Sequence, residues 1–493
     1  MKTRGWYVVV GIAALLVPVA LALVIFPTAM IDTRELFAWG RFFPLATHKH
    51  PPLMALIGGV VEAVLPANAF SAVLVGQILN AIGIGYLYAT LVLVVDRERA
   101  AFFAFLYATS LYFQLAPLSY ALNADILQVP IWLAVVYHFI RATQTNRWSH
   151  WLGLGAWAAA AVLTKYTAGL LLVAGAIATF VTPEFRKAWR NPRLGFSVAF
   201  GVLLLVPHLI ALRSNPIAIT YAEQFATIAS GAASEINSLG LFAVGTIMFL
   251  VPGWIIVAAG LSVGNVRFDR TPPGDTTALR RFLVALALAL VGVSVALVVF
   301  LGTLFNHRYG APMLGFFVMA VAPYLSFRRE TVDTAIRATI WSAAAVVGVV
   351  FLASAIAYGV FTSHNYMQEP TQEAAAIVRA EWDRHFTCGP AYILGDRPSA
   401  HGIAIAGDRR GAGVPIDDIG LATWFDRDLL GRDGAIVAFR KEIPVDEIEA
   451  ALPGTAITDQ QTFTLPLLRT WNGASITYHY FFIPPRSCAI ASR

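Results

Sequence analysis

Long apolar runs separated by short polar loops dominate the first 361 residues of the chain. An apolar α-helix needs about 20 residues to cross a bilayer, with a range of roughly 17 to 25. This pattern predicts eleven membrane-spanning helices, at residues 7–26, 69–95, 100–117, 125–142, 150–164, 167–182, 195–213, 240–261, 282–304, 311–327 and 338–361. The apolar segment 51–66 is too short to span comfortably, and we expect it to lie at the membrane surface or to re-enter the bilayer.

The remaining residues, 362–493, follow a different pattern. Helical spacing is seen near 370–386, and strand-like runs occur at 391–395, 434–439 and 475–483. The last run alternates Ile476, Tyr478 and Tyr480 with polar neighbours, as in a half-buried strand. We therefore expect two domains: a mostly α, polytopic membrane domain at 1–361, and a small α/β domain at 362–493.

The composition agrees with a membrane protein. Hydrophobic residues make up 58% of the chain and charged residues 13%, against about 25% charged residues in a typical soluble domain. The net charge of +6 is spread over short loops rather than gathered on one face, so no nucleic-acid partner is expected. The chain has neither a P-loop nor a dinucleotide-binding glycine motif, which argues against an ATP-driven pump.

The distribution of basic residues predicts the orientation. Loops on the side of the N-terminus hold seventeen lysines and arginines, and loops on the other side hold six, which favours a cytoplasmic N-terminus. Eleven spans then place residues 362–493 outside. The two cysteines of the chain, Cys388 and Cys488, both lie there. We expect a disulfide, which for a loop of about 100 residues stabilises by up to about 4.7 kcal/mol; two unpaired thiols are the alternative.

The first expected outer loop is rich in groups able to do chemistry. Asp32 and Glu35 are three residues apart and would share one face of a helix. Two such carboxylates can divide the work, one as a general base and the other as an orienting group or metal ligand. The alternative is a solvated helix with an aspartate cap at its start.

His48 and His50 flank Lys49 in the same loop and precede two prolines that favour an extended chain. In an extended stretch the two imidazoles point the same way and are able to bind a metal. Isolated histidine pairs are more often hydrogen-bonding groups. We therefore assign these three residues to substrate binding and assign no metal or other cofactor, with a divalent metal left as the alternative.

Three further outer positions carry isolated charges. Asp125 opens the span at 125–142, as a catalytic carboxylate or a helix cap. Lys165 and Tyr166 interrupt an apolar run, and the lysine either holds a phosphate or extends to the membrane surface. Arg308 and Tyr309 form another short loop, whose guanidinium is suited to phosphate or to a structural contact with residues 362–493.

Together these motifs resemble the polytopic GT-C-type glycosyltransferases of the protein O-mannosyltransferase-like group. That group includes bacterial enzymes that add aminoarabinose or galacturonic acid to lipid A. The matching motifs are the acidic stretch 32–39, His-Pro-Pro-Leu at 50–53, Asp125 at the head of the fourth span, and Leu-Thr-Lys-Tyr-Thr at 163–167. The chain departs from the group's pattern at Thr33, where many members have glutamate, and at Ala124, where many have proline.

The resemblance implies transfer of a sugar from a polyprenyl-phosphate donor, with inversion, to an acceptor at the outer face of a bacterial inner membrane. The acceptor would be lipid A, another envelope lipid or glycan, or protein, and the domain at 362–493 would be periplasmic. The implied catalytic residues are Asp32, Glu35 and Asp125, and the implied phosphate-binding residues are Lys165, Tyr166, Arg308 and Tyr309. The alternatives are a secondary transporter or lipid-linked-sugar flippase, and a membrane-anchored assembly protein.

Overall fold

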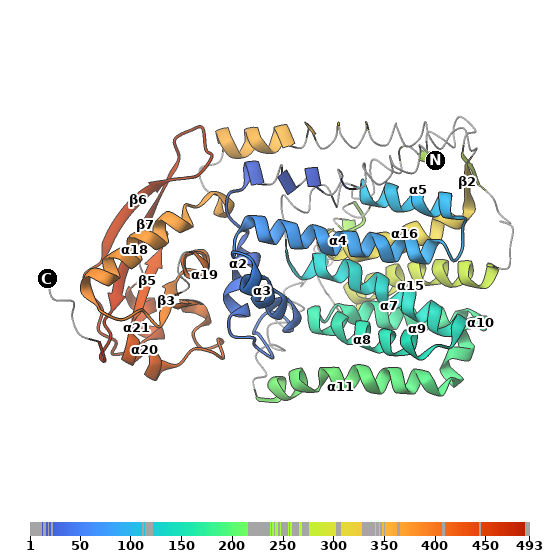
Figure 1. Ribbon diagram of the computed structural model, residues 1–493, viewed down its shortest axis with the longest axis horizontal. Helices are drawn as coiled ribbons and strands as arrows, with labels where there is room; N and C mark the ends of the chain where they lie inside the picture. Colours follow the sequence, from blue (N-terminus) through green and yellow to red (C-terminus); the bar gives the residue numbers. More distant parts are fainter. Residues whose placement is uncertain are drawn as a thin grey trace.

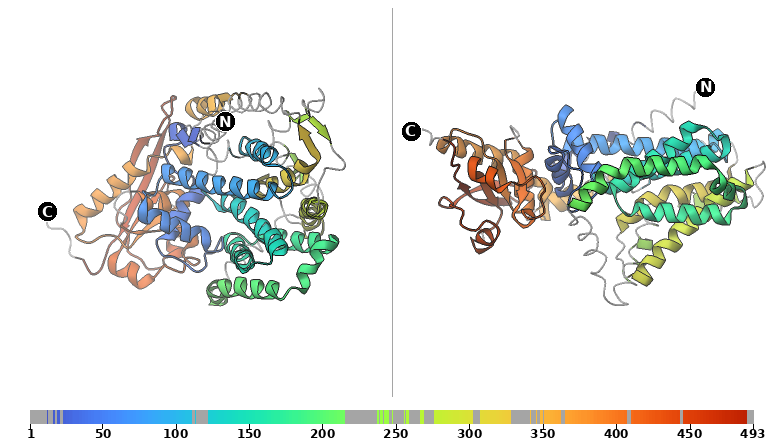
Figure 2. Two further views of the ribbon diagram at one scale, coloured as in Figure 1. Left: turned by 45° about the vertical axis from the view of Figure 1, so that its right-hand side comes forward. Right: turned by 90° about the horizontal axis from the view of Figure 1, so that it is seen from below.

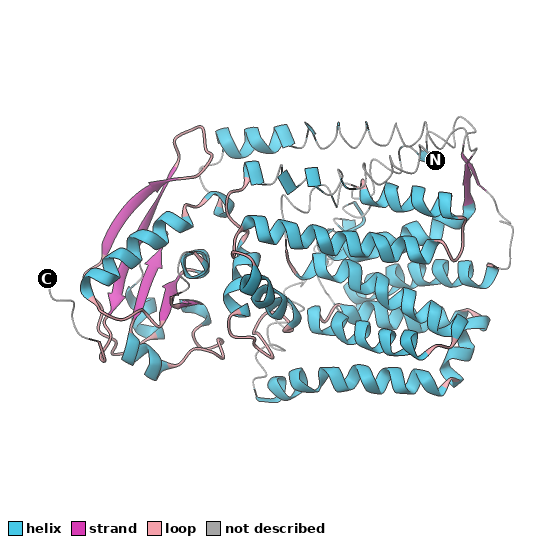
Figure 3. Cartoon of the chain, viewed as in Figure 1, coloured by secondary structure: helices cyan, strands magenta, loops and turns pink. Residues whose placement is uncertain are grey.

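The protein is mostly helical, with a small sheet at one end (Figure 3). The computed structural model describes residues 23–110, 122–214, 276–301, 307–327, 351–361, 365–406, 410–442 and 445–488, with residues 266–268 and scattered positions at 12–20, 113, 237–258 and 341–349.

Four described helices are long and apolar enough to cross a membrane. They are α4 (Ala69–Leu91), α7 (Ala124–Thr145), α11 (Pro192–Ser214) and α15 (Thr277–Leu301). A fifth candidate is bent by 108° between α9 (Ala168–Val181) and the following α10 (Pro183–Arg186) and η1 (Lys187–Arg190). Shorter helices complete this bundle: α5 (Arg97–Ala108), α8 (Trp148–Thr164), η2 (His307–Met313), α16 (Leu314–Val321) and η3 (Ala322–Tyr324).

The prediction of a multi-pass membrane protein is confirmed at the level of these four or five spans. The number eleven stays a prediction, since the spans at 7–26, 240–261 and 338–361 fall largely outside the described residues. One apolar core joins the described helices and includes Trp132, Trp151 and Leu286, each at most 1% exposed. At one end of the bundle, β1 (Val266–Phe268) pairs antiparallel with β2 (Leu325–Phe327).

The C-terminal region, residues 365–488, contains a five-stranded mixed sheet of order β4-β3-β5-β7-β6. β3 (Tyr392–Gly395) pairs parallel with β4 (Ala412–Pro415) and β5 (Ala435–Phe439), and β7 (Ser475–Ile483) pairs antiparallel with β5 and β6 (Gln461–Pro466). On one face pack α18 (Thr371–His385) and α19 (Arg397–Ile405), and on the other α20 (Arg427–Asp433) and α21 (Val445–Ala451).

The helix and three strands expected in this region are present, whereas the short strand β4 and the largely exposed strand β6 were not predicted. Cys388 and Cys488 form the expected disulfide, with their Cα atoms 5.9 Å apart. The expected domain boundary stays a prediction, because residues 362–364 lie outside the described residues. The sheet region lies at one end of the helical bundle in all views (Figures 1 and 2).

Two short helices, α2 (Ile31–Gly40) and α3 (Leu53–Val64), lie between the bundle and the C-terminal region (Figure 1). They cross at glycines: a Cβ on Gly40 would lie 2.2 Å from the Gly59 nitrogen, and one on Gly58 would lie 2.4 Å from the Leu36 oxygen. The two backbones therefore touch, and α3, the apolar segment expected at the membrane surface, supports α2 from one side.

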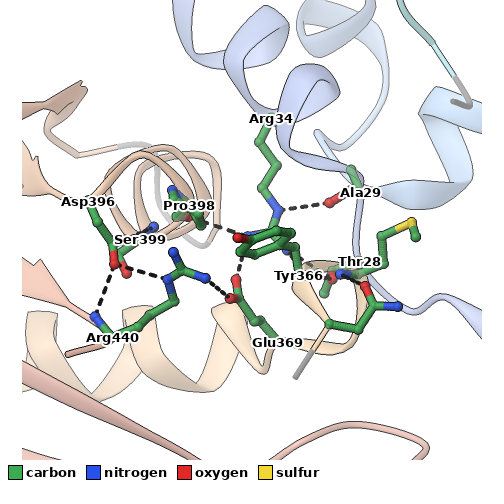
Figure 4. Close-up of polar contacts among 11 residues, drawn as sticks. Thr28, Ala29, Arg34, Tyr366, Glu369, Asp396, Pro398, Ser399 and Arg440 are labelled. Carbon is green, nitrogen blue, oxygen red and sulfur yellow. Dashed lines mark hydrogen bonds and ion pairs between the residues drawn. The ribbon is translucent and has the colours of Figure 1, made fainter. Parts of the chain in front are cut away.

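Arg34 ties the other side of α2 to the C-terminal region (Figure 4). Its guanidinium is 1% exposed and lies 2.8 Å from the Glu369 carboxylate, which is itself fully buried. Arg34 also donates to the carbonyl oxygens of Ala29, at 2.8 Å, and Tyr366. Arg440 contacts the second oxygen of Glu369 at 3.2 Å. Glu369 is thus held by one arginine from α2 and one from the C-terminal region.

We predict that Gly59→Ala destabilises the protein. The new Cβ would lie 2.3 Å from the Gly40 oxygen, so the α2 and α3 backbones must separate. Overpacking of this kind costs about 1–3 kcal/mol. Thermal unfolding in detergent would measure it, with Gly85→Ala as the control, since a Cβ at Gly85 meets nothing within 4 Å. Equal melting temperatures for the two variants would contradict the tight crossing.

We also predict that Glu369→Gln loosens the C-terminal region from α2. Removing one partner of a buried ion pair costs about 3–5 kcal/mol, because the Arg34 charge is left uncompensated. Limited proteolysis and thermal unfolding would report the change. Glu373→Gln, on the exposed face of α18, is the matched control. If both variants resist protease equally, the ion pair does not hold the two parts together.

Candidate active site

The two carboxylates of α2 share one cation. The Lys49 ammonium donates to Asp32 Oδ1 at 2.9 Å and to Glu35 Oε2 at 2.8 Å. Asp32 lies in the first turn of α2, but Met30 occupies the N-cap position, so Asp32 is not the cap that the alternative interpretation required. The helical spacing thus places both acids on one face, as predicted, and the loop that follows α2 returns Lys49 to that face.

These two carboxylates lie in different surroundings. The Glu35 side chain is 1% exposed, whereas that of Asp32 is 32% exposed. Burial raises the pKa of the Glu35 carboxyl, against the opposing charge of Lys49. Burial alone would lower the pKa of Lys49, but the charges of Glu35 and Asp32 outweigh it and raise that pKa. The lysine therefore stays charged, and Asp32 is the more accessible of the two acids.

Residues of the C-terminal region complete this cluster. Arg397, at the start of α19, places its Nε 3.4 Å from Glu35 Oε1 and its terminal nitrogen 3.2 Å from Asp418. His48 lies with its Nε2 3.5 Å from the same Asp418 carboxylate. Burial lowers the pKa of His48, although Asp418 opposes the shift. The His48 imidazole is therefore neutral at pH 7.

A second ion pair joins α7 to the junction between α8 and α9. Lys165 Nζ lies 2.7 Å from Asp125 Oδ1, and the two side chains are 15% and 13% exposed. Asn123 caps α7 by accepting from the Ile126 N–H at 3.0 Å, so Asp125 is not the cap. The Lys165 ammonium thus binds the Asp125 carboxylate.

One hydrogen bond and the electrostatic environment of His50 link the two ion-pair clusters. Thr33 on α2 donates to the Leu122 oxygen at 2.8 Å, just before α7. Burial is the main cause that lowers the pKa of His50 to about 3. The positive charges of Lys49 and Lys165 lower it in the same direction. The His50 imidazole is therefore neutral, and both lysines are close enough to influence it.

Tyr166, the neighbour of Lys165, binds His208 of α11, which in turn binds the loop after α2. Its hydroxyl lies 3.0 Å from His208 Nε2, and His208 Nδ1 donates to the Leu45 carbonyl oxygen at 2.8 Å. Donation to a carbonyl fixes the tautomer, so Nε2 accepts from the tyrosine hydroxyl. His208 thereby fixes the hydroxyl of Tyr166, the residue that follows Lys165 in the chain.

An apolar cavity of about 370 Å³ lies among α7, α8, α9, α11 and α15. Its lining includes Val162 of α8, three residues before Lys165, and Leu171 of α9. The cavity continues along α9 to Thr179. At its other end the lining includes Ala188 and Trp189 of η1.

Not every predicted site residue falls in the described part of the chain. The backbone of η2 begins at His307, but the Arg308 and Tyr309 side chains lie outside the described residues. Within the described ranges, no group of three or more histidines, cysteines or acids is arranged to hold a metal ion.

Several residues of the site were not predicted from the sequence. Arg397 and Asp418 belong to the C-terminal region, whose sequence pattern gave strands and a helix but no partner for α2. Asp396, which caps α19, and the proline at 398 mark a helix start after strand β3, and this signal could have located Arg397. Nothing in the sequence pattern indicated a role for His208, which is a single histidine in an otherwise apolar span.

Part of the chain matches a known protein family. Residues 49–210, about a third of the chain, match the family described as dolichyl-phosphate-mannose-protein mannosyltransferase. This segment contains Lys49, Asp125, Lys165 and His208. A search of curated protein sequences found no match.

Among solved structures, the chain resembles ArnT from Cupriavidus metallidurans in the apo state, with a TM-score of 0.60, 14% identity, and coverage of 97% of this chain and 98% of that one. The oligosaccharyltransferase of Archaeoglobus fulgidus is more distant, with a TM-score of 0.42, 12% identity, and coverage of 82% and 64%. The predicted resemblance is confirmed: residues 49–210 match this mannosyltransferase family, and the chain as a whole shares the fold of ArnT.

Proposed function

We propose that the protein transfers a sugar from a polyprenyl-phosphate donor to a cell-envelope acceptor. The observation that carries the proposal is the arrangement of an accessible carboxylate, Asp32, beside a buried one, Glu35, near a second lysine–aspartate pair. A base for the acceptor and a cation for the leaving phosphate are the two groups that such a transfer needs.

Asp32 is the base in this proposal. The acceptor hydroxyl oxygen bonds to the anomeric carbon of the sugar, while the bond from that carbon to the phosphate oxygen breaks. The hydroxyl proton passes to Asp32, and the bonding electron pair leaves with the polyprenyl phosphate. Attack from the face opposite the leaving group inverts the anomeric carbon. Glu35 is too buried to contact the acceptor. Its role in this proposal is to hold the Lys49 ammonium in place beside Asp32.

Lys165 stabilises the charge that develops on the leaving phosphate. Asp125 orients the ammonium through the 2.7 Å ion pair, and Tyr166 is fixed beside it by His208. Arg308 and Tyr309 are proposed to join this phosphate site. The polyprenyl chain is proposed to occupy the apolar cavity among α7, α8, α9, α11 and α15, since its lining reaches to within three residues of Lys165.

The acceptor is proposed to be lipid A, another envelope lipid or glycan, or protein, bound at the outer face of a bacterial inner membrane. Two observations support this orientation. The basic residues favour a cytoplasmic N-terminus. The Cys388–Cys488 disulfide is typical of an oxidising compartment such as the periplasm.

A transfer assay in liposomes tests the proposal, with labelled polyprenyl-phosphate sugars and candidate acceptors. We predict that Asp32→Asn lowers transfer by about 10²–10⁴-fold, the usual contribution of a general base. Lys165→Ala should lower both transfer and donor hydrolysis, because the leaving phosphate loses its cation. Asp417→Asn and Lys187→Ala, both at exposed positions, are the matched controls and should retain wild-type activity.

The variants also separate the alternatives. Activity that survives Asp32→Asn but not Lys165→Ala would mean that the acceptor is already ionised and needs no base. If wild-type protein consumes none of the donors but moves them across the membrane, the enzyme proposal fails and a flippase replaces it.

A further inference from the structure

Arg397 reaches from the C-terminal region into the acidic cluster of α2. It follows Asp396, which caps α19 by accepting from the Ser399 N–H at 2.9 Å, so the first turn of the helix is fixed. From that position its guanidinium lies 3.4 Å from Glu35 and 3.2 Å from Asp418. α19 packs directly against α2. The arginine therefore bridges the two parts of the protein at the proposed catalytic helix.

Glu35 is held by cations on both of its oxygens. Lys49 binds Oε2 at 2.8 Å from the loop after α2, and Arg397 faces Oε1 from the C-terminal region. The carboxylate is 1% exposed, so it depends on these two charges for stabilisation. The Arg397 side chain is 36% exposed and that of Lys49 is 12% exposed. Solvent and substrate therefore reach Arg397 more easily than Lys49.

We propose that Arg397 is a positioning residue of the transferase site, which holds Glu35 from the C-terminal region and so fixes Lys49 against Asp32. The inference rests on the proposed function. If Arg397 is lost, only Lys49 faces the buried Glu35 carboxylate. The ammonium is then drawn toward Glu35 and away from Asp32, the proposed base. The C-terminal region is thus part of the active site and not an independent attachment.

If Arg397 has this role, the activity of the enzyme should depend on pH through the pKa of Glu35. Asp32 lies on the same helix, Lys49 and His48 come from the following loop, and Arg397, Asp418 and the buried His401 come from the C-terminal region. Burial and Asp32 raise the pKa of Glu35, whereas Lys49 and Arg397 lower it. Without Arg397 the pKa of Glu35 rises further, so the carboxyl takes up a proton at a higher pH and activity is lost earlier on acidification.

The test is the pH profile of kcat and KM for sugar transfer by the full-length protein in liposomes. Arg397→Gln should lower kcat by about tenfold, since the cation that faces Glu35 Oε1 is lost. It should move the acidic limb of the profile up by about one pH unit, with the KM for the donor unchanged. Arg397→Lys keeps the charge and should restore the wild-type limb.

Arg384→Ala is the matched control, because this arginine is 73% exposed on α18 and pairs with Glu381 of the same helix. Size-exclusion and thermal unfolding would verify that each variant folds. A wild-type pH profile for Arg397→Gln would overturn the inference while the proposed function stands. No transfer by the wild-type protein would overturn the proposed function, and the inference with it.

Discussion

The buried ion pair between Arg34 and Glu369 is the contact on which the arrangement of the proposed site depends. α2 has only ten residues, and a helix of that length is not stable in isolation. Its position is therefore set by its contacts with neighbouring elements. Arg34 fixes it to the C-terminal region, and the glycine crossing fixes it to α3. Asp32 and Glu35 are carried by the same helix, and their orientation follows from these two constraints.

The same helix shows how one fold gives two carboxylates different roles. Asp32 and Glu35 share Lys49, whereas Glu35 is the more deeply buried of the two and also faces Arg397 of the C-terminal region. Desolvation separates the two acids more than their chemistry does. In the second pair, Asp125 with Lys165, the lysine follows α8, whose Val162 lines the apolar cavity proposed to hold the lipid of the donor.

Sequence reasoning located the elements that local pattern determines. The apolar helices, the α/β character of the C-terminal region, the disulfide and the acids of α2 all follow from periodicity, composition or short motifs. Contacts between distant segments were not predictable, because no periodic signal links α2 with Glu369, Arg397 or Asp418. The role of Asp125 was ambiguous for a related reason: an aspartate in the first turn can cap a helix, and only the structure assigns the cap to Asn123.

The most direct test of the central claim is an experimental structure of the protein with a polyprenyl phosphate bound. The account predicts that the phosphate lies within hydrogen-bonding distance of Lys165 and that the lipid enters the cavity among α7, α8, α9, α11 and α15. It also predicts that Asp32 faces the side from which the acceptor would approach. A phosphate bound elsewhere, with Lys165 still paired to Asp125 and the cavity empty, would contradict it.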